Sequence, residues 1–229
     1  MAFTKPKNLT DWFERVYVIN RPDRPQRLQE FYENVESTEV ADPSKIIVYP
    51  AIMGDKTSFP SYFLSGAGAW GCLRSHSNII ENLILEQVNT GVKIKSVLIL
   101  EDDVKFINNP LFMLHEFMTS VPKNWDQIYL GGQHRVKPQD TSNIRVKRGL
   151  SVNRTHAYAL NRKVFRMFYC HINNASEYCH KQNHHIDHQL EIAHRKEAWN
   201  VYCPPVWLAG QREGYSDVCN KSLEYRDWN

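Results

Sequence analysis

The stretch Ser96–Glu101 (SVLILE), which runs directly into Asp102 and Asp103, decides the fold. A continuous run of leucine and β-branched residues that ends in acids is typical of a central strand in a parallel sheet. Open α/β sheets bind their ligands beyond the carboxyl ends of such strands. We therefore expect the functional site at the acids that follow Leu100.

Strand-length apolar runs alternate with helix-like segments on both sides of this stretch. Before it, the pattern predicts strands over 16–20 and 46–49 and helices over 25–35 and 70–87. After it, the pattern predicts strands over 126–130, 155–160 and 199–203 and helices over 163–171 and 186–196. The βαβαβ order of the first part indicates a doubly wound sheet.

Length and composition favour a single domain over 1–229. The chain has 229 residues, of which 42% are hydrophobic and 23% charged, as in a globular domain with an ordinary core. The longest stretch of apolar residues and proline, 46–53, is far shorter than the roughly 20 residues that a transmembrane helix needs. Without a secretory signal, we expect a cytoplasmic protein that can act at a membrane surface, with its five cysteines reduced.

The acids Glu101, Asp102 and Asp103 predict a metal site. If strand geometry continues through them, Glu101 and Asp103 point to one side and Asp102 to the other. Carboxylate oxygens suit Mg²⁺ or Mn²⁺, and a cation relieves the repulsion among three neighbouring acids. The alternative is a solvated acidic turn after a strand.

Three arginines follow the first predicted strand at intervals of three residues. Arg21, Arg24 and Arg27 would lie roughly on one face at the start of a helix, where guanidinium groups and the helix N-terminus favour phosphate. The alternative is a surface turn with exposed arginines. Further along the chain, three glycines precede the helix predicted over 70–87 and permit close backbone approach.

The segment 133–166 is strongly basic. It contains nine arginines and lysines against one acid, a local charge of +8 in a chain whose net charge is +3. Such a field suggests an anionic partner: a nucleotide diphosphate, a phosphorylated glycan or a nucleic acid. The alternative is a solvated loop with scattered bases.

Several motifs in order resemble glycosyltransferase family 25, which includes lipopolysaccharide and collagen galactosyltransferases. The motifs are VYVIN with RPDRPQR, GAWGCLRSH, VLILEDDV, DQIYLGG and THAYALNR, between Val16 and Arg162. The resemblance implies a GT-A fold, α/β with a Rossmann-like, mostly parallel central sheet flanked by helices. It also implies Mn²⁺ or Mg²⁺ and a nucleoside-diphosphate sugar, expected to be a UDP-sugar, as donor.

The resemblance also implies roles for individual residues. Glu101 and Asp103 would bind the metal, Asp102 would face the ribose, and Ser75 and His76 would lie near the nucleotide. His76 could equally be a core histidine. The residues that would meet the nucleotide are Asn20, Arg21, Arg24 and Arg27. The nucleotide-binding half would span about 1–132 and the acceptor-side half about 133–229.

The expected reaction is transfer of a hexosyl or pentosyl group with inversion at the anomeric carbon. It needs a base that takes the proton of the acceptor hydroxyl. Asp187 is the favoured base and Asp217 the second choice; Asp187 could instead be a first-turn acid that stabilises its helix. The third metal ligand stays open among Gln211, Asp217 and water. Arg148 and Arg154 could support the leaving diphosphate.

Three alternatives concern the acceptor and the class of protein. The acceptor could be a glycan such as lipopolysaccharide, a protein side chain or a hydroxymethylated base in DNA, the last through the basic segment. The chain could be a non-catalytic binding protein, although the intact acids argue against it. Cys179, His184 and His188 could instead bind zinc, because the two histidines are four residues apart.

Overall fold

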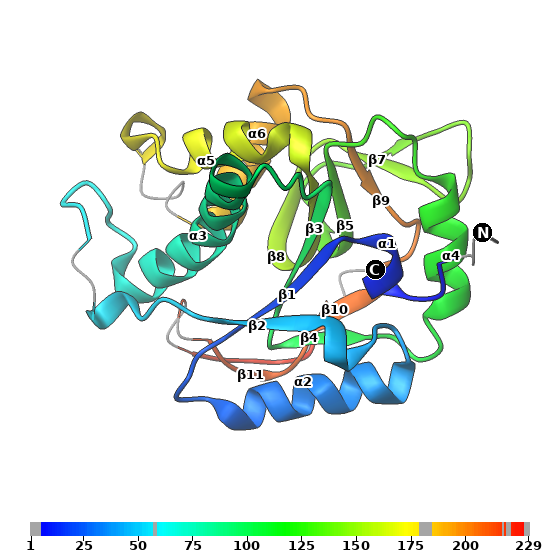
Figure 1. The fold of residues 1–229 in the computed structure, drawn as a ribbon, viewed down its shortest axis with the longest axis horizontal. Helices are drawn as coiled ribbons and strands as arrows, with labels where there is room; N and C mark the ends of the chain where they lie inside the picture. The colour runs from blue at the N-terminus through cyan, green and yellow to red at the C-terminus, as the bar shows by residue number, and fades with distance from the viewer. Residues whose placement is uncertain (1–5, 57–58, 179–184, 217, 219–220, 227–229) are drawn as a thin grey trace.

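The computed structural model describes residues 6–56, 59–178, 185–216, 218 and 221–226, and its centre is an eight-stranded sheet (Figure 1). The strand order is β2-β1-β3-β8-β5-β9-β7-β6. The strands are β1 (Arg15–Asn20), β2 (Ile46–Pro50), β3 (Ser96–Glu101), β5 (Gln127–His134), β6 (Gln139–Asp140), β7 (Lys147–Gly149), β8 (Val152–Asn161) and β9 (Val201–Cys203). Two small sheets pair β4 (Val104–Phe106) with β10 (Ala209–Gln211) and β11 (Gly214–Ser216) with β12 (Lys221–Leu223).

The sheet is mixed, but most of its strands run in one direction. Parallel pairs join β1 to β2, β1 to β3 and β5 to β9, whereas β8 and β7 are antiparallel to their neighbours. The predicted α/β class with a mostly parallel central sheet flanked by helices is therefore confirmed. The antiparallel β8 lies beside β3, with Leu100 opposite Ala157, so the beginning of β8 lies next to the acids at the end of β3.

Helices cover both faces of the sheet (Figure 1). They are α1 (Leu9–Trp12), α2 (Pro25–Thr38), α3 (Gly66–Thr90), α4 (Leu111–Ser120), α5 (Phe165–Ile172) and α6 (Ile186–Lys196). Short 3₁₀ turns occur at Pro43–Lys45, Gly54–Lys56, Arg162–Val164 and Ala175–Tyr178.

The strand β3 shows why the sheet is buried on both sides. Its side chains alternate, so that Val97 and Ile99 join the core under α3, α5 and α6, while Leu98 and Leu100 join the core under α1, α2 and α4. All four side chains are fully buried. The side chains of β3 are continuously apolar from Val97 to Leu100 because both faces of the strand are covered.

The predicted strands and helices are present, with some shifted boundaries. The main correction concerns α3, which begins at Gly66 rather than at residue 70, so Gly66 and Gly68 lie inside the helix together with Gly71 instead of ahead of it. The helices α1 and α4 and the short strands β4, β6, β7, β10, β11 and β12 are additional to the prediction.

Two glycines allow segment 51–55 to lie close to the first turns of α3. A Cβ on Gly71 would lie 2.4 Å from the carbonyl oxygen of Ile52, and a Cβ on Gly54 would lie 1.7 Å from that of Ala67. Segment 51–55 can therefore pack against the first turns of α3 only because both positions lack a side chain.

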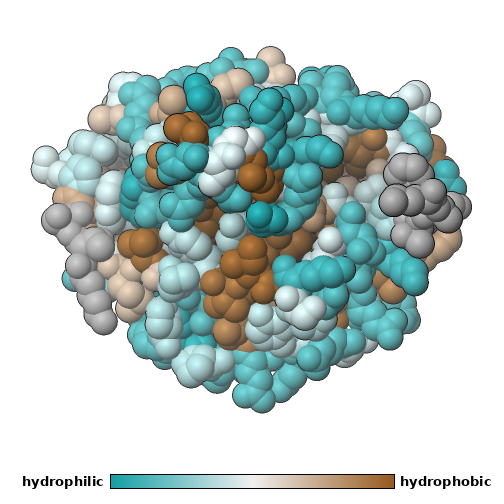
Figure 2. Space-filling view, in the orientation of Figure 1, coloured by the Kyte–Doolittle hydropathy of each residue, from teal (hydrophilic) through white to brown (hydrophobic). Residues whose placement is uncertain are grey.

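The molecular face in Figure 2 is mostly hydrophilic, with hydrophobic side chains near its centre. In the part of the chain that the structure describes, the helices are too short or too polar to span a bilayer.

Candidate functional site

A cavity of about 590 Å³ opens at the carboxyl ends of β1 and β3. Its walls come from the β1–α2 connection, segment 51–55, the first turns of α3, the beginning of β8 and the first turn of α6. This is the position at which open α/β sheets bind ligands. The residues predicted for the site that line it are Arg21, Arg27, Ser75, His76, Glu101, Asp102, Asp103, Arg154, Asp187 and Gln211.

Glu101 occupies the side of the cavity formed by α3. Its Oε1 accepts a hydrogen bond from Thr155 Oγ1 at 2.6 Å and lies 3.4 Å from His76 Nε2. The other ring nitrogen of His76, Nδ1, is 3.0 Å from the hydroxyl oxygen of Tyr158. Burial alone would raise the pKa of Glu101, but His76 and Thr155 outweigh it and lower the pKa to about 2.

Asp102 is held by groups from the first strand and the helix after it. Asn20 Nδ2 donates to Asp102 Oδ2 at 2.7 Å, and Arg27 Nη2 lies 2.5 Å from Oδ1. Burial raises the pKa of Asp102, and the charge of Arg27 opposes that rise. Asn20 does not line the cavity; it also donates to the backbone oxygen of Arg24, so it acts as a support for Asp102.

Asp103 occupies the side of the cavity formed by α2. Arg27 Nη2 and Gln211 Nε2 each lie 3.2 Å from Asp103 Oδ2, whereas Oδ1 is buried with no hydrogen-bond partner among the described residues. Burial raises the pKa of Asp103 to about 7, with a further contribution from the Glu101 charge.

Strand geometry does not continue through all three acids. Glu101 is the last residue of β3, and Asp102 and Asp103 lie in the turn that follows. Both aspartates contact Arg27, while Glu101 faces α3. The strand geometry expected to separate Asp102 from Glu101 and Asp103 is therefore absent, because the turn brings both aspartates to Arg27, and all three acids line the same cavity.

These acids fit a hard divalent cation. Among the described residues Asp103 Oδ1 has no hydrogen-bond partner, and all three acids line one cavity. Burial and the Glu101 charge raise the pKa of Asp103 despite the contacts with Arg27 and Gln211. A cation ligated there would compensate its negative charge.

Two of the predicted nucleotide-site residues from α3 have internal partners. Ser75 Oγ accepts from the backbone nitrogen of Ile52 at 2.8 Å and donates to the backbone oxygen of Gly71, so it holds segment 51–55 on the helix. His76 is 1% exposed and lies between Tyr158 and Glu101. Both line the cavity while holding its wall together.

The favoured base, Asp187, lies in the first turn of α6 and lines the same cavity as the three acids. Its Oδ1 accepts from the backbone nitrogen of His188 at 2.9 Å. Asp217 lies outside the described residues, as do Cys179 and His184 of the zinc alternative.

Sequence reasoning missed Thr155 and gave Arg154 only a supporting role. Arg154 lines the cavity with a left-handed φ of 80°, a backbone conformation that is costly for a residue with a side chain. Arg148 lines a separate, shallower pocket beside α6, and Arg24 is also absent from the cavity wall. The threonine was hidden because only the antiparallel direction of β8 brings it to Glu101.

Several bases of the segment 133–166 have acidic partners or belong to the cavity. Arg145 pairs with Glu116, Lys147 with Asp140, and Lys163 with Asp126, which offsets part of the local charge. Arg154 belongs to the cavity.

No family model and no curated protein matches the sequence. Among solved structures, similarity is found to a glycosyltransferase involved in glycosylation of the major capsid of PBCV-1, with 14% identity over 74% of this chain and 72% of that chain (TM-score 0.39). Mouse xyloside xylosyltransferase 1 in its apo form shares 11% identity over 82% and 83% (TM-score 0.42). A CMP:2-keto-3-deoxy-manno-octonic acid synthetase complexed with CTP shares 10% over 82% and 88% (TM-score 0.42). At these identities and TM-scores, none of the three assigns a function to the chain.

Proposed function

We propose that the chain is a metal-dependent glycosyltransferase that moves a sugar from a nucleoside-diphosphate sugar, a UDP-sugar by expectation, to an acceptor hydroxyl with inversion. The observation that carries the proposal is the cavity at the ends of β1 and β3, where Asp103 Oδ1 has no partner in the described part of the chain and lies beside two further carboxylates and Arg27. A glycan such as lipopolysaccharide is the proposed acceptor.

The two sides of the cavity would bind different parts of the donor. Arg21 and Arg27 are the cationic groups of the α2 side and would meet the diphosphate. Glu101 and Asp103 would hold Mn²⁺ or Mg²⁺, which when bound stabilises negative charge on the departing diphosphate. Asp102, fixed by Asn20, would face the ribose.

Asp187 would accept the proton of the acceptor hydroxyl. It lines the same cavity but comes from α6, so the base and the acids reach the reacting centre from separate elements. A carboxylate at this position can take the proton as the sugar bond forms.

Nucleotide binding tests the donor site directly. Thermal unfolding is measured with UDP, GDP, CDP and ADP, each with and without Mn²⁺, for the wild-type chain, Asp103→Asn and the control Asp140→Asn. Asp140 is exposed and pairs with Lys147 away from the cavity. A ligand at about 100 times its Kd adds roughly 2.7 kcal/mol to the free energy of unfolding. We expect a Mn²⁺-dependent shift with one nucleotide that Asp140→Asn keeps and Asp103→Asn loses. A wild-type chain that no nucleotide stabilises would overturn the proposal.

Donor hydrolysis separates an enzyme from a binding protein without knowledge of the acceptor. Asp187→Asn should keep the nucleotide-dependent shift and lose about 10²- to 10⁴-fold in turnover of the donor that wild type accepts. Normal turnover in this variant would remove Asp187 from the base role. Nucleotide binding with no turnover of any donor or glycan acceptor would favour the non-catalytic alternative.

A further inference from the structure

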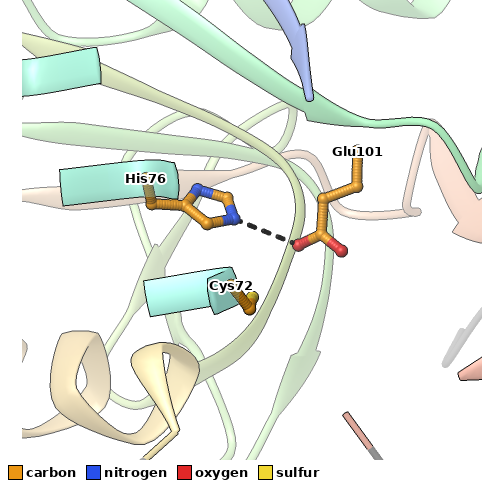
Figure 3. Close-up of side chains that lie close together, drawn as sticks. All are labelled: Cys72, His76 and Glu101. Carbon is orange, nitrogen blue, oxygen red and sulfur yellow. Dashed lines mark ion pairs between the residues drawn. The ribbon is translucent and has the colours of Figure 1, made fainter. Parts of the chain in front are cut away.

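We propose that Cys72, His76 and Glu101 form a binding site for a soft divalent cation such as Zn²⁺ on the α3 side of the cavity (Figure 3). The site does not rest on the proposed function, because it takes sulfur and imidazole ligands and needs no nucleotide, although the two metals would compete for Glu101. It shares only Glu101 with the acids at the end of β3.

Helix geometry brings two of the ligands together. Cys72 and His76 are four residues apart in α3 and therefore lie on one face of the helix. That face is opposite the end of β3, and Figure 3 shows the side chains converging with Glu101. One ligand atom from each residue lies within 4.8 Å of the other two.

The distances suit coordination of one ion. Bonds of about 2.3 Å to sulfur and about 2.0 Å to nitrogen or oxygen place tetrahedral ligands roughly 3.5 Å apart. His76 Nε2 and Glu101 Oε1 are already 3.4 Å apart. Cys72 also lines the cavity, with its Sγ within 4.8 Å of a ligand atom of each of the other two residues.

The ligands are oriented by neighbours, as in metal sites generally. Tyr158 OH contacts His76 Nδ1 and so directs Nε2 toward Glu101. Thr155 Oγ1 holds the Glu101 carboxylate in place. A second hydrogen bond on the far nitrogen of a ligating histidine fixes its ring orientation.

The ligand set decides the kind of ion. A thiolate and an imidazole favour Zn²⁺ or Co²⁺, whereas Mg²⁺ and Mn²⁺ prefer oxygen. On binding, the Cys72 thiol releases its proton to solvent and the sulfur bonds the metal. Three protein ligands leave one position facing the cavity, the arrangement of zinc sites that take up a further ligand.

Cobalt absorption tests the site, because a bond between thiolate sulfur and Co²⁺ gives a near-ultraviolet charge-transfer band that oxygen ligands do not. The full chain is titrated with Co²⁺ alone. We expect one equivalent to produce the band and Zn²⁺ to remove it by competition, while Mg²⁺ leaves it unchanged. The variant Cys72→Ser should lose the band, and Cys170→Ser, which alters an exposed cysteine on α5, should keep it.

Two further variants make the result decisive. Tyr158→Phe keeps all three ligands but should weaken Co²⁺ binding about 10- to 100-fold through loss of the orienting contact. Asp103→Asn should keep the band even if it abolishes nucleotide binding, so failure of the two proposals is distinguishable. The proposal would be overturned if the wild-type chain gave no band. It would also be overturned if folded Cys72→Ser kept the band, and Cys179, His184 and His188 would then be the next candidates for the ligands.

Discussion

On the α3 side of the cavity, Glu101 accepts a hydrogen bond from Thr155 and faces His76, and its pKa falls to about 2. On the α2 side, two residues further along the chain, Asp103 has one oxygen to which no described residue donates, and its pKa rises to about 7. The side chains of Glu101 and Asp103 are each 22% exposed, so the difference between their pKa values comes from their partners. The Glu101 carboxylate therefore stabilises the folded chain, whereas the Asp103 carboxylate destabilises it when no cation is bound.

Asp103→Asn should produce the largest change, in the absence of metal. The pKa of Asp103 rises from 3.8 to about 7 on folding, so the folded chain holds this proton more tightly than the unfolded chain does. The free energy of unfolding of wild type therefore decreases as pH increases through that range. The stability of the variant relative to wild type should therefore increase between about pH 4 and pH 7. Above pH 7 the difference should reach at most about 4 kcal/mol. Urea unfolding in the presence of a chelator measures the gap, which Mn²⁺ should close. Equal pH profiles for the two chains would contradict the difference between the sides.

Glu101→Gln should have the opposite effect. The pKa of Glu101 falls from 4.5 to about 2 on folding, so its stabilisation is present above about pH 4.5 and is lost as pH falls toward 2. The variant should be about 3 kcal/mol less stable at pH 7, with a smaller deficit under acidic conditions. Urea unfolding at several pH values tests this. Glu86→Gln, which breaks a partly exposed pair with Arg15, is the control and should cost under about 1 kcal/mol.

The first half of the chain could be predicted closely, and the details of the site could not. The strand predicted over 16–20 is Arg15–Asn20, because a buried strand requires an uninterrupted apolar run. The contact between Thr155 and Glu101 depends on the direction of β8, which hydrophobic periodicity does not encode. The turn at Asp102 and Asp103 was equally hidden, because three consecutive acids have the same pattern in a strand and in a turn.

Arg27→Gln should affect the α2 side alone. Arg27 is within 3.2 Å of both Asp102 and Asp103, and its loss leaves two carboxylates without their cationic partner. We expect a loss of about 2 kcal/mol at pH 8, partly restored by Mn²⁺. Chemical unfolding with and without Mn²⁺ provides the measurement. The control is Arg195→Gln, which breaks the ion pair of the exposed Arg195 with Glu191. If Mn²⁺ restores nothing, a cation does not bind at these acids.

Tyr158→Phe should give the smallest change in stability and affect only the α3 side. It removes the hydroxyl beside His76 Nδ1 and should cost about 1 kcal/mol. Tyr169→Phe, which removes a hydrogen bond to Glu81 on the outside of α3, is the matched control. Nucleotide-dependent stabilisation should survive in both variants. Its loss in Tyr158→Phe alone would show that the two sides are coupled.

The assembly of the cavity has a consequence for the folding of the chain. Asn20 and Asp102 are 82 residues apart in sequence, as are His76 and Tyr158, and Thr155 joins Glu101 across 54 residues. Contacts of such long range require large loops to close and form slowly. Ligand binding should therefore appear only after the strands β1, β3 and β8 have paired. A bound nucleotide or Co²⁺ would then report the last step of refolding, later than the helical signal.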